Sequence, residues 1–202
     1  MRSERAVANV SELPTVVFGS RGLVWWGTVS FMVIEGFTMA LTAMTYLYLR
    51  KNFDSWPPHR TPRPSLLVPT INMAIMLASL PLAWWTKQAA ERIDLAKVRI
   101  GLLASTLVSV VVLGLRIAEF WSLETQWNSD AYGSIIWVIL GFHATILLVD
   151  VFETAGFTAI MYSPNREPKH WPEVADNAGY WFFAVLSWVP LYLLVFIGPR
   201  VM

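Results

Sequence analysis

The sequence contains no cysteine and few charged residues for its length. The absence of cysteine among 202 residues excludes a disulfide framework, thiol catalysis, an iron–sulfur cluster and a dinuclear copper site of the thiolate type. Charged residues make up 14% of the chain, whereas a soluble domain carries about 25%. A net charge of +1 gives no electrostatic reason to expect nucleic acid as a partner. The shortage of charge predicts a membrane protein.

Long apolar stretches occupy most of the chain, in which 55% of the residues are hydrophobic. A helix needs about 20 apolar residues to cross a hydrocarbon layer of roughly 30 Å. We therefore expect an all-α integral membrane protein, with a polar cytoplasmic arm at residues 1–22 and one membrane domain at residues 23–202. The five predicted transmembrane helices are residues 23–49, 66–85, 98–121, 132–162 and 180–197.

The segments between these stretches have the composition of loops. Residues 56–64 hold four prolines, residues 86–97 are charged, and residues 163–177 hold three prolines, none of which suits a helix interior. Aromatic pairs such as Trp25–Trp26 and Tyr180–Trp181 lie near the predicted helix ends, where membrane proteins place aromatic rings at headgroup level. One side of the predicted topology carries nine basic residues and the other carries five. This asymmetry predicts a cytoplasmic N-terminus and an external C-terminus.

Titratable residues inside a membrane are costly, so each is a candidate functional residue. Glu35 follows the first Trp pair by about ten residues and is expected near the middle of the bilayer. Two hypotheses stay open for this carboxyl group. It is either a proton-linked or subunit-contacting group, or a neutral group that is hydrogen-bonded to a neighbouring helix.

Two further sets of polar residues lie on the third and fourth predicted helices. Arg116 and Glu119 are three residues apart, which places them on one helix face, and an ion pair at the membrane interface is expected. His143, Asp150 and Glu153 have spacings of seven and three, which also predicts a shared face. A polar face toward a partner subunit, a lipid headgroup or a water-filled cleft is favoured there over a metal site.

The sequence offers no catalytic centre of its own. Of its three histidines, His59 and His170 fall in predicted loops, so His143 alone is expected inside the membrane. Haem held by two intramembrane histidines is thereby excluded, and haem held by Met and His stays open. No phosphate-binding loop, dinucleotide fingerprint or nucleophile elbow is present.

Several segments carry motifs in a definite order. They are WWGTVSFMVIEGF at 25–37, WPP at 56–58 followed by LLVPTINMAIMLAS at 66–79, RIAEFW at 116–121, SDAYGSIIWVILGFHATILL at 129–148, and YWFFAVLSWVPLYLLVF at 180–196. In this order, over about 175 residues, the chain resembles subunit III of the haem–copper terminal oxidases, which comprise the cytochrome c and quinol oxidases.

The resemblance assigns individual positions. Glu35 falls on the family's intramembrane carboxyl, which reacts with carbodiimides, and Asn72, Glu119 and His143 fall on family motif positions. This chain departs from the pattern where the family has a second motif histidine and the histidine and aspartate of its last motif. The residues found there are Ile146, Phe182 and Val185.

The resemblance implies a non-catalytic subunit without haem or copper of its own. Its partners would be subunit I as the main contact, subunit II and bound phospholipid, in a bacterial-type plasma membrane. The first two helices would be separated from the other three by a lipid-filled cleft, and the subunit would stabilise subunit I and support proton uptake. Glu35, Asn72, Glu119, His143, Asp150 and Glu153 would be proton-linked residues or contacts with subunits or lipid.

Two alternatives remain at this stage. The first is the related accessory subunit of a nitric oxide reductase. The second is an independent proton-coupled transporter that uses Glu35 and the face formed by Asp150 and Glu153. Five helices without an evident inverted repeat make the transporter the less favoured of the two.

Overall fold

The computed structural model describes residues 16–58 and 61–201 as five long helices with short connections. Each helix is long and apolar enough to cross a membrane, which confirms the predicted fold class. A short 3₁₀ turn, η1 (Gly19–Arg21), precedes α1, and a π-helical segment, η2 (Leu193–Ile197), continues α5 into α6 (Gly198–Val201). The long helices are α1 (Leu23–Lys51), α2 (Leu67–Glu91), α3 (Leu95–Ser122), α4 (Ala131–Tyr162) and α5 (His170–Tyr192).

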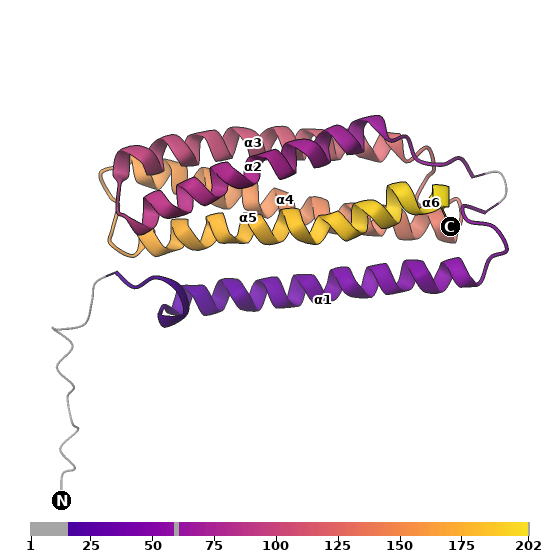
Figure 1. The fold of residues 1–202 in the computed structure, drawn as a ribbon, viewed down its shortest axis with the longest axis horizontal. Helices are drawn as coiled ribbons and strands as arrows, with labels where there is room; N and C mark the ends of the chain where they lie inside the picture. The colour runs from indigo at the N-terminus through magenta and orange to yellow at the C-terminus, as the bar shows by residue number, and fades with distance from the viewer. Residues whose placement is uncertain (1–15, 59–60, 202) are drawn as a thin grey trace, which may run out of the picture.

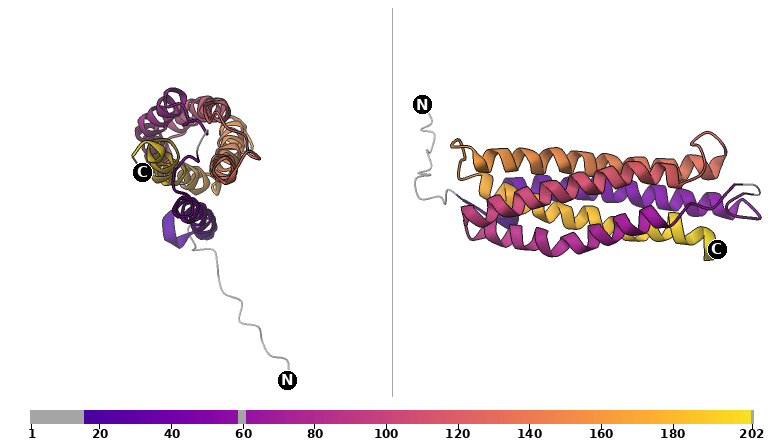
Figure 2. Two further views of the ribbon diagram at one scale, coloured as in Figure 1. Left: turned by 90° about the vertical axis from the view of Figure 1, so that its right-hand side faces the viewer. Right: turned by 90° about the horizontal axis from the view of Figure 1, so that it is seen from above.

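Helices α2 to α5 form a four-helix bundle, and α1 lies against its outside (Figure 1). The end-on view separates α1 clearly from the ring of the other four helices (Figure 2). Helix α2 packs along α3 and α5, and α3 packs along α4, whereas α1 packs on α4 and α5. The helices therefore group as four plus one and not, as the resemblance implied, as two plus three.

The difference in burial between α1 and α2 explains this grouping. Helix α1 buries only Met39 and Tyr46, whereas α2 buries side chains along its whole length. The outer face of α1 is apolar, and Val33, Phe37 and Met44 are 64%, 66% and 64% exposed. Such a face suits lipid or another subunit and leaves α1 with a limited contact area on the bundle.

Side-chain caps fix the starts of α3 and α4. The carboxylate of Asp94 accepts a hydrogen bond of 3.2 Å from the backbone N–H of Lys97, and Asp130 accepts one of 2.6 Å from that of Gly133. Both satisfy amide groups that the first helical turn leaves without partners. The contacts from Lys97 also hold the pKa of Asp94 below its ordinary value of 3.8. The short α2–α3 connection and the start of α4 are therefore defined by local chemistry.

Two helices differ most from their predicted bounds. Helix α2 continues to Glu91 and not to residue 85, and α5 begins at His170, ten residues before the predicted start. The residues added to α5 include Pro172, which is tolerated in a first turn because its missing N–H has no partner there. Hydropathy marks the apolar part of a helix and does not mark a polar turn that projects beyond it. Tyr180 and Trp181 consequently lie inside α5 and not at its start, and both are buried.

The loop between α1 and α2 folds back onto one end of the bundle. Trp56 is buried and packs edge-to-face on Tyr46 and Tyr132, with ring centroids 5.3 and 5.0 Å apart. Arg200 reaches the same loop and donates to the carbonyl oxygen of Pro64 at 2.5 Å. These contacts connect the end of α1, the start of α4 and the C-terminal turn.

Candidate functional site

The candidate site has two parts, one where α1 meets the bundle and one inside the bundle. In the first part, the hydroxyl of Tyr180 on α5 donates a 2.5 Å hydrogen bond to Oε2 of Glu35 on α1. Tyr180 is 5% exposed, and Glu35 is half-buried. Of the two hypotheses for Glu35, the structure therefore supports a hydrogen bond to a neighbouring helix, and the partner comes from α5.

A groove of about 360 Å³ separates part of α1 from α4 and α5. Apolar and polar side chains both line it, and the polar ones are Thr28 of α1, Glu153 of α4 and Glu173, Asn177 and Tyr180 of α5. Glu153 lies within electrostatic range of both Glu35 and Tyr180. The Glu35–Tyr180 contact and the groove thus place two carboxyl groups beside one buried phenol.

Asp150 and Glu153 do not share a face, contrary to the prediction. Glu153 is exposed toward the groove, whereas Asp150 is 1% exposed and faces the interior of the bundle. A spacing of three residues sets two side chains about 60° apart around the helix axis, and the boundary between the bundle interior and the groove passes between them. His143 is also fully buried, and its side chain faces Trp188 of α5.

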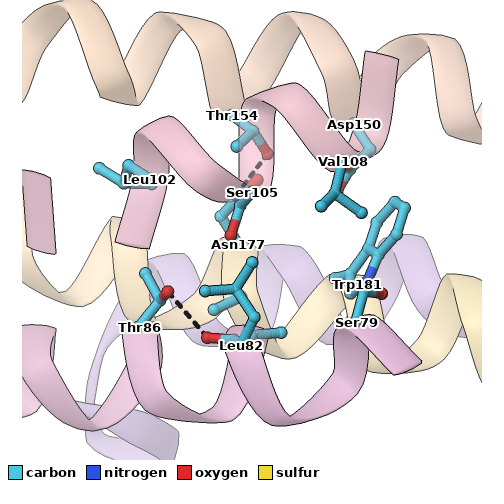
Figure 3. Close-up of a pocket in the computed structure, with 12 residues that line it drawn as sticks. Ser79, Leu82, Thr86, Leu102, Ser105, Val108, Asp150, Thr154, Asn177 and Trp181 are labelled. Carbon is cyan, nitrogen blue, oxygen red and sulfur yellow. Dashed lines mark hydrogen bonds between the residues drawn. The ribbon is translucent and has the colours of Figure 1, made fainter. Parts of the chain in front are cut away.

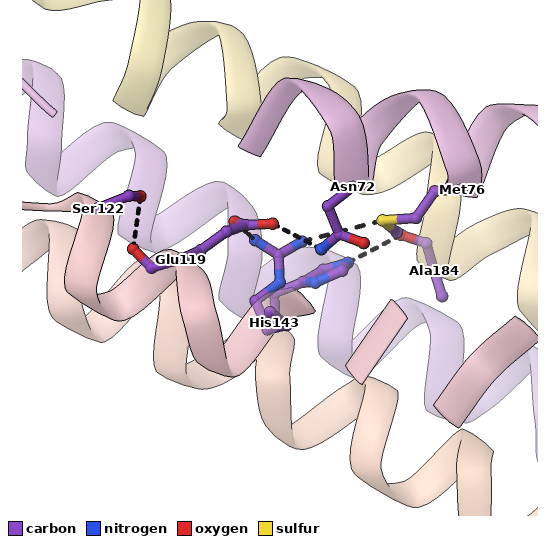
Figure 4. A network of polar contacts seen from close by, with 7 residues as sticks. Asn72, Met76, Glu119, Ser122, His143 and Ala184 are labelled. Carbon is purple, nitrogen blue, oxygen red and sulfur yellow. Dashed lines mark hydrogen bonds and ion pairs between the residues drawn. The ribbon is translucent and has the colours of Figure 1, made fainter. Parts of the chain in front are cut away.

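The second part is a polar network that connects all four bundle helices (Figure 4). Nη1 of Arg116 lies 2.5 Å from Oε2 of Glu119, and Nδ2 of Asn72 donates to Oε1 of the same carboxylate at 2.5 Å. The guanidinium group of Arg116 stacks on the ring of Trp188, 3.8 Å from its centroid. Such stacking suits a planar, weakly hydrated cation.

His143 completes this network from α4. Its Nε2 lies 3.0 Å from the carbonyl oxygen of Ala184, and a carbonyl only accepts, so this ring nitrogen is the donor. The imidazole ring also packs on Trp188, with centroids 4.5 Å apart. With Nε2 as the donor, Nδ1 is the unprotonated nitrogen, and it is buried without a hydrogen-bond partner.

The predicted ion pair between Arg116 and Glu119 is confirmed, and it lies inside the bundle. Both side chains are 0% exposed because α2, α4 and α5 cover the face of α3 that carries them. Within residues 16–58 and 61–201, no group of three or more His, Asp or Glu side chains is arranged to hold a metal ion. The network is therefore a set of internal contacts between helices and not a ligand set.

The structure brings together residues that sequence reasoning treated separately. Asn72, Glu119 and His143 belong to the bundle network, and Glu35 is hydrogen-bonded to Tyr180, which lines the groove together with Glu153. Tyr180 and Asn177 were missed as site residues. Tyr180 resembled a headgroup aromatic, and Asn177 lay in a predicted loop. The available signal was the helical spacing of three between Asn177 and Tyr180, which becomes visible only once α5 is extended to His170.

The fold and the site define an integral membrane helical bundle with a buried structural network and an outer helix whose exposed face is apolar. Comparison with known proteins identifies the family. The family model described as "Cytochrome c oxidase subunit III" matches residues 17–199, so the chain belongs to the cytochrome c oxidase subunit III family.

Individual relatives agree over most of the chain. "Cytochrome c oxidase subunit 3" of a Synechocystis species is 24% identical over 197 residues, covering 94% of this chain and 83% of the relative. The Thermostichus vulcanus protein of the same description is 25% identical over 179 residues, covering 86% and 87%. The human protein is 25% identical over 187 residues, covering 91% and 71%.

Family membership answers the question of activity. The family is a non-catalytic membrane subunit of cytochrome c oxidase, and its members carry no redox cofactor. This chain is accordingly a subunit of a haem–copper oxidase of the respiratory chain and assembles with other oxidase subunits.

Proposed function

We propose that this chain covers and stabilises catalytic subunit I of its oxidase and supports proton uptake through Glu35. The observation that carries the proposal is the hydrogen bond between Glu35 and Tyr180. It holds a carboxyl group on the otherwise apolar helix α1, in a fixed position beside the groove. An ionisable group inside a membrane is costly unless it has a partner, and Tyr180 supplies that partner.

The outer face of α1 and the groove support the proposed contacts. The exposed apolar side chains of α1 suit burial against subunit I, with subunit II and other subunits nearby. The groove between α1 and the bundle is lined by apolar side chains such as Val24, Phe31 and Phe157, a lining that suits the acyl chain of a phospholipid. Loss of a co-purifying lipid from a Phe31→Trp complex, measured by native mass spectrometry, would support the lipid assignment, and unchanged lipid content would reject it.

The proposed orientation places the N-terminus in the cytoplasm of a bacterial-type plasma membrane. The α2–α3 turn, with Lys97, would then face the cytoplasm, and the α3–α4 loop, with Glu124, would face outward. Because the chain has no cysteine, single Cys variants at these two positions report on topology without background. Labelling of Glu124→Cys but not Lys97→Cys by an impermeant thiol reagent in intact cells is expected, and the reverse pattern would overturn the orientation.

The role of Glu35 is tested by Glu35→Gln in the complete oxidase. Glutamine keeps an oxygen that can accept from Tyr180 but cannot carry a proton. We expect normal assembly and initial oxygen consumption, followed by faster loss of activity during sustained turnover. Thr38→Val, one turn further along α1, is the matched control and should inactivate at the wild-type rate. Unchanged inactivation kinetics in Glu35→Gln would reject the proton-uptake role.

A further inference from the structure

A small polar cavity lies inside the four-helix bundle, separate from the groove beside α1 (Figure 3). It leaves about 20 Å³ for the centres of water molecules. Polar side chains from all four helices contribute to its walls, together with apolar residues such as Leu102 and Val108. The polar lining residues are Ser79, Thr86, Ser105, Asp150, Thr154, Asn177 and Trp181.

Two buried oxygen atoms at this cavity have no hydrogen-bond partner. They are Oδ1 of Asp150 and Oδ1 of Asn177, on side chains that are 1% and 7% exposed. The amide nitrogen of Asn177 is engaged, because Nδ2 donates to Oγ1 of Thr154 at 2.9 Å. The oxygen of that amide is therefore the end left without a partner, and both unpartnered atoms are acceptors.

The hydroxyl groups of Ser79 and Thr86 do not serve these acceptors, since their protons are used elsewhere. Oγ of Ser79 donates to the carbonyl oxygen of Met76 at 2.6 Å and accepts from Nε1 of Trp181 at 2.8 Å. Oγ1 of Thr86 donates to the carbonyl oxygen of Leu82 at 2.9 Å. The cavity is lined by no Lys, Arg or His. Buried acceptors in native proteins have partners, and ordered water supplies the missing ones.

We propose that this cavity binds one internal water molecule, which donates one hydrogen bond to Asp150 and the other to Asn177. The cavity volume suffices for a single water molecule. A water molecule can donate two hydrogen bonds, one to each of the two unpartnered acceptors. Asn177 lines both this cavity and the groove beside α1, so it is the point at which the bound water exchanges with the groove. The inference concerns this chain alone and does not depend on the role proposed for Glu35.

A double-mutant cycle in the intact oxidase complex tests the shared water. Asp150→Leu or Asn177→Leu alone removes one of the two acceptors of the water and leaves the other acceptor in place. Each single variant should therefore lower the thermal midpoint of the complex. The double variant displaces the water and removes both acceptors together, so its loss should be clearly smaller than the sum of the two single losses. Asp150→Leu combined with Ser187→Ala, at a half-buried hydroxyl elsewhere on α5, is the matched control and should be additive.

The water itself is sought in a high-resolution electron cryo-microscopy map of the wild-type complex. A single density peak within hydrogen-bond distance of both oxygen atoms is the expected result. Because the map uses the wild-type complex, it tests the proposal even if a single variant fails to assemble. Additive losses in the cycle, an empty cavity, or a peak surrounded by five or more oxygen ligands at cation distances would each overturn the proposal.

Discussion

At the scale of single residues, the environment of Arg116 determines whether its charge can be buried. The desolvation of a buried ion pair often exceeds its Coulombic attraction, unless further contacts satisfy the remaining donors and acceptors. Here Asn72 donates to the second oxygen of Glu119, and the face of Trp188 covers the guanidinium plane. These partners come from α2 and α5, so the pair on α3 is stable only when the bundle is assembled.

Removal of one charge from this pair should destabilise the bundle strongly. Arg116→Met leaves the carboxylate of Glu119 buried without a counter-charge, which costs about 3–5 kcal/mol. The double variant Arg116→Met/Glu119→Gln removes the uncompensated charge and keeps an acceptor for Asn72, so most of the stability should return. Thermal unfolding and assembly yield of the complex measure both effects. A double variant as unstable as Arg116→Met alone would show that the pair does not act as described.

At the scale of helices, close approach of α2 and α3 depends on the absence of a side chain at Gly101. A Cβ atom at this position would overlap the side chain of Thr86 on α2, and a β-branched residue in a helix has little freedom to move away. Gly114, further along α3, has no neighbour within 4 Å of the corresponding position. Gly101 therefore lies in a close contact with α2, whereas Gly114 lies on an exposed side of α3.

Substitution of these two glycines by alanine should give opposite results. Gly101→Ala overpacks the contact and should destabilise the bundle by about 1–3 kcal/mol, and adding Thr86→Ala should restore stability. Gly114→Ala meets no obstacle and favours the helix, so a small gain of about 0.5–1 kcal/mol is expected. Differential scanning fluorimetry of the purified complex compares the three variants. Equal effects at positions 101 and 114 would contradict the described packing.

At the scale of the whole molecule, the sequence is sufficient to predict the number of helices and their membrane setting. The thickness of a bilayer imposes the length of an apolar run, and this constraint is readable without a structure. Hydropathy does not predict where α5 begins, because the residues from His170 to Asn177 are not a continuous apolar run. Helix propensity and packing make them helical. The four-plus-one grouping was also missed, since both α1 and α2 are apolar and only tertiary contacts distinguish them.

The same limit applies to the candidate site. Glu35, His143 and Asp150 were identified because a titratable residue inside an apolar run is conspicuous. Their neighbours Tyr180, Trp188 and Asn177 were not, because an aromatic or amide side chain has several ordinary roles in a membrane helix. Asp150 faces the bundle interior, whereas Glu153 faces the groove beside α1. This difference could be predicted only once the position of α1 was known.

The measurement that tests the central claim most directly is the composition of the complex that this chain forms in its own membrane. Gentle solubilisation, capture through a tag on this chain and a reduced-minus-oxidised spectrum would reveal the haem groups of the partners. We predict a haem protein that also carries copper, because the chain belongs to a family of oxidase subunits. Haem b without copper would favour a nitric oxide reductase. Recovery of the chain with no haem protein at all would contradict its assignment as a subunit of a respiratory oxidase.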